Sequence, residues 1–138
     1  GGGTTDYAVE IYHNALLIGK YSSFLKKDTK LPMMYMEDAI EATIKIMEAV
    51  PENIKIRSSY NLAAMSFTPE EIANEIKKNV PEFEISYHSD FRQNIADSWP
   101  KSIDDSRARQ DWGWEHKFDI TEMTKSMLNN LHSKYQEL

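Results

Sequence analysis

The spacing of apolar residues along this chain switches between that of a helix and that of a strand, and this alternation constrains the fold most. From Ala8 to Leu16 apolar residues recur every three or four positions, as in an amphipathic helix. At Phe83, Ile85 and Tyr87 they alternate with polar residues, as in a half-exposed strand. Because helical and extended segments follow one another, we expect an α/β chain. Its 138 residues suffice for one core, so we treat residues 1–138 as a single lobe.

The other elements are predicted from the same spacings and from capping residues. Thr68-Pro69-Glu70-Glu71 is typical of a helix start, because threonine accepts from the backbone, proline fits the first turn and glutamate can reach back. Strands are expected at 21–25, 32–36 and 54–62, an ordered loop at 90–104, and helices at 105–111 and from Asp119 onward.

One further helix is predicted after Asp38, which we expect to cap it, and it should end before Pro51. The residues expected to face the core share helical spacing and are Ile40, Thr43, Ile44 and Met47.

The composition argues against several classes of function. With 16 Lys and Arg against 22 Asp and Glu, the formal charge of −6 disfavours nucleic acid as a partner. The absence of cysteine excludes a disulfide framework and a thiolate site, and the four histidines stand at no metal-binding spacing, so no metal is expected. No apolar run approaches the roughly 20 residues that span a bilayer, and no signal-like leader opens the chain, so we expect an intracellular domain without a membrane partner.

The first candidate site is Thr4, Thr5 and Asp6, which follow three glycines and precede a helix. Hydroxyls and helix N–H groups can bind a carboxylate, and Asp6 can bind an ammonium group, so the cluster suits a zwitterion. Ordinary capping of the helix by one of the three residues is the alternative. The glycines opening onto a helix also indicate a loop inside a larger fold, with a cloning remnant as the alternative.

The second candidate is Trp99, which stands beside Pro100 in the aperiodic segment. An indole in an ordered loop can wall a small-molecule pocket, although packing in the core is an equal alternative. Trp112 and Trp114 flank Gly113 and are predicted to pack at a helix end. Arg107 and Arg109 lie among aspartates, so local ion pairs are expected for them.

Two sequence motifs with a known chemical role are absent from the chain. There is no glycine-rich loop between a strand and a helix, so these residues cannot bind a dinucleotide by that route. There is also no tyrosine followed four residues later by lysine.

Four segments resemble the C-terminal half of the short-chain, epimerase-like L-threonine 3-dehydrogenases. They are GGGTTDYAVEIY at 1–12, LPMMYMEDA at 31–39, YNLAAMSFTPEE at 60–71 and DFRQNIADSWPKSIDDSRARQDWGW at 90–114. The resemblance implies the C-terminal, substrate-binding part of an extended short-chain dehydrogenase, with an incomplete Rossmann-type fold. It places the nucleotide-binding half upstream of Gly1.

The resemblance also implies a reaction and a set of site residues. In the family, NAD accepts a hydride from the β-carbon of L-threonine while a tyrosine assisted by a lysine removes the hydroxyl proton, giving 2-amino-3-oxobutanoate. Those catalytic residues and the glycine-rich fingerprint lie in the other half, so none is expected here. Thr4, Thr5, Asp6 and Trp99 match substrate-contacting positions. The complete enzyme is expected to be a homodimer, cytoplasmic in bacteria or in the mitochondrial matrix of eukaryotes.

Two other functions stay open at this point. The chain could be a non-catalytic relative that binds a small amino acid or a partner, which upstream sequence carrying the missing motifs would exclude. It could also be the lobe of a sugar-nucleotide epimerase or dehydratase. That function predicts a larger and more basic pocket for a diphosphate, which the acidic composition disfavours.

Overall fold

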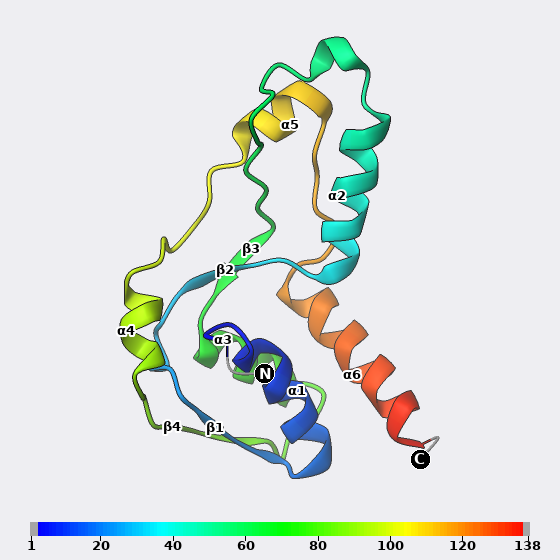
Figure 1. Ribbon diagram of the computed structural model, residues 1–138. Coiled ribbons are helices and arrows are strands. Elements are labelled where there is room, and N and C mark those ends of the chain that lie inside the picture. The colour runs from blue at the N-terminus through cyan, green and yellow to red at the C-terminus, as the bar shows by residue number, and fades with distance from the viewer. Residues whose placement is uncertain (1–2, 137–138) are drawn as a thin grey trace.

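The computed structural model describes residues 3–136, in which helices and short strands alternate (Figure 1). Gly1 and Gly2 lie outside the described residues, so the expectation for the opening glycines concerns Gly3 alone. The helices are α1 (Tyr7–Leu17), α2 (Met36–Glu48), the short 3₁₀ helix η1 (Pro51–Asn53), α3 (Pro69–Lys77), α4 (Arg92–Asp97), α5 (Ser106–Trp112) and α6 (Ile120–Gln136). The strands are β1 (Lys20–Ser23), β2 (Leu31–Met33), β3 (Met65–Phe67) and β4 (Glu84–Tyr87).

The strands form two small sheets of two strands each. β1 pairs with β4 in parallel, with Lys20 opposite Glu84 and Ser23 opposite Tyr87. β2 pairs with β3 in antiparallel fashion, with Leu31 opposite Phe67. The mixture of helices and strands confirms the predicted class, and the small sheets are consistent with an incomplete Rossmann-type domain.

The larger core surrounds α1 at the end of the molecule that also holds β1, β4, α3 and α6 (Figure 1). The inner face of α1 buries Ile11, Tyr12 and Ala15, as its spacing predicts, and Tyr7 is buried as well. The predicted capping box of α3 is present: the Thr68 hydroxyl accepts from the Glu71 N–H at 3.1 Å and the Glu71 carboxylate accepts from the Thr68 N–H at 2.8 Å.

A smaller core lies at the other end, where α2 meets α5 (Figure 1). Trp114 is fully buried there, and its indole N–H donates to the Ala63 carbonyl at 3.0 Å. The ring of Trp112 packs edge-on against Tyr60, with centroids 5.9 Å apart. Gly113, between the two tryptophans, has φ of 71° and ends α5 in the left-handed conformation. The packing role predicted for both tryptophans is therefore confirmed.

Asp38 does not cap α2 as predicted. Tyr35 occupies the N-cap position, and Asp38 lies inside the first turn with its side chain buried. Its carboxylate accepts from the backbone N–H groups of Lys117 at 2.8 Å and Phe118 at 3.0 Å. Asp38 thereby fixes the segment that leads into α6 against α2.

The prediction of which face of α2 packs inward was also wrong. Asp38 and Ala42 are the buried residues of this helix, and Ile46 packs on the smaller core. The predicted stripe faces outward instead, with Ile40, Thr43, Ile44 and Met47 all exposed. The helix carries apolar residues on two faces. Trp112 and Trp114 pack against the face that holds the small Ala42.

Two other predictions need correction. The segment 54–62, predicted as a strand, contains no strand, because it has no neighbouring strand to pair with among the described residues; β3 begins only at Met65. The loop predicted at 90–104 contains α4, a short helix from Arg92 to Asp97. Six residues are too few to show a helical period in the sequence.

The hydroxyl of Tyr7 is buried without a hydrogen-bond partner among the described residues. Burial raises the pKa of this phenol far above its usual range, so the group stays neutral. An unpaired buried hydroxyl is unfavourable, so we expect Tyr7→Phe to raise the free energy of unfolding by about 1 kcal/mol. Urea denaturation measures this change. A loss of stability in the variant would instead show that the hydroxyl has a stabilising partner.

Candidate functional site

The turn before α1 holds three of the four predicted site residues. Thr4 is buried, and Thr5 and Asp6 are half-buried. Asp6 occupies the N-cap position of α1 but makes no side-chain cap bond; one carboxylate oxygen accepts from the N–H of Gly3 at 2.9 Å. The alternative from the sequence was capping by Thr4, Thr5 or Asp6, and of these Asp6 does not cap α1 with its side chain.

Thr5 and Asp6 line a cavity of about 280 Å³, which we call the Asp6 cavity. Its walls are mostly apolar and come from α1, β2, the start of α2, β3 and α6. They include Val9, Met33, Met36, Phe67, Met123 and Met127. Asp6 adds a negative charge to these mostly apolar walls, and a ligand of opposite charge is attracted to it. The cavity suits a small ligand with one ammonium group and an apolar part.

Two tyrosines add phenol rings to the same cavity and are held by α6. The Tyr12 hydroxyl lies 2.8 Å from the Thr124 hydroxyl, and the Tyr35 hydroxyl lies 3.0 Å from that of Ser126. Burial raises the pKa of Tyr12 well above its usual range, so its phenol is a neutral group and not a base. The lining of the cavity therefore has a single side-chain anion, Asp6.

Trp99 lies elsewhere, just after α4, and lines a second cavity of about 220 Å³, which we call the Trp99 cavity. The indole is 42% exposed, so it is not a core residue. Three lysines, Lys26, Lys30 and Lys101, also line this cavity, and none of them has an ion pair within residues 3–136. Two carboxylates, those of Asp28 and Asp97, line the same cavity, so its charged residues are of both signs.

Gln93 organises the Trp99 cavity, and nothing in the sequence singled it out. Its amide oxygen accepts from the Lys26 N–H at 2.8 Å, and its amide nitrogen donates to the Asp97 carboxylate at 2.6 Å and to the Thr29 hydroxyl at 3.0 Å. These bonds fasten the 26–29 turn to α4. A lone glutamine in an aperiodic segment carries no sequence signal for such a role.

The four predicted residues do not line one cavity in this chain. Trp99 is absent from the lining of the Asp6 cavity, and Thr5 and Asp6 are absent from that of the Trp99 cavity; Thr4 lines neither. In Figure 1 the connection from β1 to β2 runs between α4 and the start of α1. Within the described residues, Thr5 and Asp6 are thus brought together and Trp99 is held apart.

The arginines of α5 form the predicted local ion pairs. Arg109 contacts Asp105 at 2.9 Å and Arg107 contacts Asp111 at 3.4 Å, each one helical turn away. The Tyr60 hydroxyl donates to Asp111 at 2.8 Å. This bond, with Arg107 and Lys55 nearby, holds the pKa of Asp111 below its ordinary value of 3.8.

The lowered pKa of Asp111 predicts a loss of stability in acid. A carboxyl with a depressed folded-state pKa contributes stability that is present above the unfolded-state pKa and is lost as the pH falls through the folded-state value. We expect the Tm to fall as the pH drops below about 4, with a shallower fall for Asp111→Asn, which has no charge to lose. Thermal melts between pH 3 and 7 test this. Equal slopes for the two proteins would contradict the assignment.

Residues 3–136 show neither a metal site nor a membrane-spanning helix. No group of three or more acidic, histidine or cysteine side chains could hold a metal ion. None of the helices in this range is long and apolar enough to cross a membrane.

Comparisons with known proteins relate nearly the whole chain to one class. No family model matches it. The mitochondrial L-threonine 3-dehydrogenase of Bos taurus is 55% identical over 130 residues, which are 94% of this chain and 35% of that protein. The structure of L-threonine dehydrogenase from Phytophthora infestans matches with a TM-score of 0.94 at 54% identity, covering 97% of this chain and 43% of that one. The apo GalE-like L-threonine dehydrogenase of Cupriavidus necator matches with a TM-score of 0.91 at 57% identity, covering 95% and 47%.

The chain and its fold are thus similar to part of the GalE-like L-threonine dehydrogenases. Its homologues are L-threonine 3-dehydrogenases, which confirms the resemblance drawn from the four sequence segments. The chain spans between about a third and a half of the length of these relatives.

Proposed function

We propose that residues 1–138 are the substrate-binding lobe of an NAD-dependent L-threonine 3-dehydrogenase whose nucleotide-binding half lies upstream. The observation that carries the proposal is the identity of 54–57% with threonine dehydrogenases over at least 94% of this chain. The Asp6 cavity supports it independently, because its one carboxylate and apolar walls complement an amino acid with a methyl group.

In this proposal Asp6 binds the ammonium group of L-threonine, and Thr5, with Thr4 behind it, faces the polar groups of the substrate. The apolar wall formed by Val9 and the methionines accepts the methyl group. The partly exposed indole of Trp99 is proposed to reach the substrate from the α4 side of this lobe. Such positioning matters, because a misplacement of about 1 Å can change a rate on the order of a hundredfold.

These residues fit a substrate and not a dinucleotide. The described glycines are Gly3, Gly19 and Gly113, and none of them stands in a glycine-rich loop between a strand and a helix. NAD, bound by the other half, would accept the hydride from the β-carbon. The complete enzyme is proposed to be a homodimer, located in the cytoplasm of a bacterium or in the mitochondrial matrix of a eukaryote.

A graft tests the proposal directly. Residues 3–136 replace the matching segment of the C. necator enzyme, to which they are 57% identical, and NADH formation is followed with L-threonine and NAD⁺. We expect threonine-dependent NADH from the graft, none from the 138-residue chain alone, and no turnover of a UDP-sugar by either protein. Turnover of the UDP-sugar without threonine oxidation would assign the chain to the epimerases instead. A folded graft that binds NAD⁺ and oxidises neither substrate would favour the non-catalytic relative.

A further inference from the structure

Arg92 begins α4, and its guanidinium group is held on two sides. The central carbon of the guanidinium lies 3.3 Å from the centroid of the buried Phe24 ring, as in a cation–π contact. The Asp90 carboxylate accepts from Nε at 3.0 Å and from Nη2 at 2.6 Å. Because this carboxylate balances its charge, Arg92 is not a free receptor for an anionic ligand.

The Phe24 ring connects Arg92 to the start of α1. It packs edge-on against the ring of Tyr7, with centroids 6.4 Å apart. Tyr7 is fully buried and directly follows Asp6 in the sequence. Side-chain contacts therefore run without a break from the first residue of α4 to the neighbour of Asp6.

Trp99 is attached to the opposite end of α4. Its N–H donates to the Ala96 carbonyl at 3.1 Å, so the indole follows any movement of the helix. Gln93 and Ala96 are the buried residues of this short helix, which has six residues in all. A helix with so few anchors takes its direction from each of them, and the contact of Arg92 with Phe24 is one.

We propose that Arg92 is a positioning residue for threonine oxidation, which fixes Trp99 relative to Asp6 by stacking on Phe24. The inference rests on the proposed function, in which Asp6 and Trp99 contact one substrate from two elements. Arg92 lines neither the Asp6 cavity nor the Trp99 cavity, so it acts through Trp99 and not by touching the substrate. Lysine replaces it only in part, because an ammonium group lacks the flat guanidinium that covers a ring and meets a carboxylate at two atoms.

A double-mutant cycle in the graft tests this role. Arg92→Met keeps the apolar stem of the side chain and removes the guanidinium, and Trp99→Ala removes the indole. We expect each single substitution to lower kcat/KM for L-threonine roughly tenfold or more, because small misplacements in a site are costly. The double variant should be no more than about twofold worse than Trp99→Ala, since the effects of residues that act through one another do not add. The KM for NAD⁺ should not change in any of them.

The outcomes separate this inference from the proposed function. Threonine oxidation by the unsubstituted graft supports the proposed function whatever the variants do. An unchanged kcat/KM in Arg92→Met would overturn the positioning role, and so would losses that multiply fully in the double variant. If circular dichroism shows that Arg92→Met has lost helix, Arg92→Lys, which keeps the charge beside Asp90, takes its place in the cycle. A smaller loss is then expected, and the same criterion applies.

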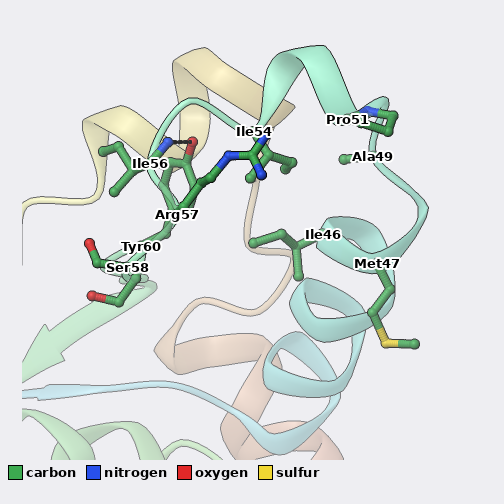
Figure 2. A pocket seen from close by; sticks show the side chains of 10 residues that line it. Ile46, Met47, Ala49, Pro51, Ile54, Ile56, Arg57, Ser58 and Tyr60 are labelled. Atoms are coloured by element: carbon green, nitrogen blue, oxygen red, sulfur yellow. Dashed lines mark hydrogen bonds between the residues drawn. The ribbon is translucent and has the colours of Figure 1, made fainter.

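Arg107→Met is the matched control. Arg107 also pairs with a nearby aspartate, Asp111 at 3.4 Å, but it lies on α5, at the other end of the molecule from α4 (Figure 1). Asp111 accepts as well from Tyr60, which Figure 2 shows at the wall of a cavity of about 530 Å³ beside α2. None of these residues lines the Asp6 or the Trp99 cavity, so kcat/KM for L-threonine should be unchanged in the control. Equal losses in Arg107→Met and Arg92→Met would overturn the proposal, because removal of any paired arginine would then suffice.

Discussion

Asp6→Asn in the graft is expected to raise the KM for L-threonine roughly ten- to 150-fold, the effect of losing about 1.5–3 kcal/mol from one charged hydrogen bond. The neutral amide keeps the size of the side chain but cannot balance the ammonium charge in a cavity with mostly apolar walls. The KM for NAD⁺ should stay within twofold, because NAD⁺ is bound by the other half.

Two controls separate recognition from folding in this experiment. Glu52→Gln removes the same charge from an exposed position in η1 and should leave both KM values unchanged. Circular dichroism should show the same helix content for all variants, since the bond from the Gly3 N–H to Asp6 is an exposed one that an amide oxygen can also accept. An unchanged threonine KM in Asp6→Asn would remove Asp6 from the site.

Asp38→Ala is expected to lower the free energy of unfolding of the 138-residue chain by about 2–5 kcal/mol. The buried carboxylate accepts two backbone N–H groups, at Lys117 and Phe118, and each would lose its charged partner inside the protein. Asp38→Asn should cost less, because the amide oxygen still accepts. Urea denaturation monitored by tryptophan fluorescence measures both.

Asp119→Ala is the matched control for Asp38. Asp119 also accepts from two backbone N–H groups, those of Thr121 and Glu122 at 2.8 and 2.9 Å, but these bonds are exposed. Water replaces the lost acceptor there, so the expected loss is only about 0.5–2 kcal/mol, as for other exposed helix caps. Equal losses at the two positions would show that burial of Asp38 contributes nothing.

Elements that carry their own end signals could be predicted from sequence. The helix that begins after Thr68 has its capping box where it was expected, because the box depends on residues within a few positions. The orientation of α2 could not be predicted. Its row of Ile40, Ile44 and Met47 is as apolar as the face that packs inward, and a sequence pattern does not say which face meets the core of this chain.

The segment 54–62 shows a different limit. Its composition favours a strand, but a strand exists only where a second one supplies hydrogen bonds, and none does so among the described residues.

The candidate site could be predicted in part. Thr5 and Asp6 are adjacent in sequence and therefore share one cavity, whereas their meeting with Trp99 depends on tertiary positions that no spacing encodes. The role of Gln93 could not be predicted for the same reason, because its partners include the 26–29 turn, which is distant in sequence. The sequence predicts the residues of the Asp6 cavity walls to be apolar, but it does not predict that they meet around one cavity.

The most direct measurement compares L-threonine with 3-hydroxybutyrate, which has the same carbon skeleton without the ammonium group. The ratio of their kcat/KM values is determined for the graft and for its Asp6→Asn variant. If Asp6 recognises the ammonium group, the substitution lowers this ratio roughly tenfold or more and barely affects 3-hydroxybutyrate. An unchanged ratio, with both substrates impaired alike, would contradict the recognition of threonine by this chain through Asp6.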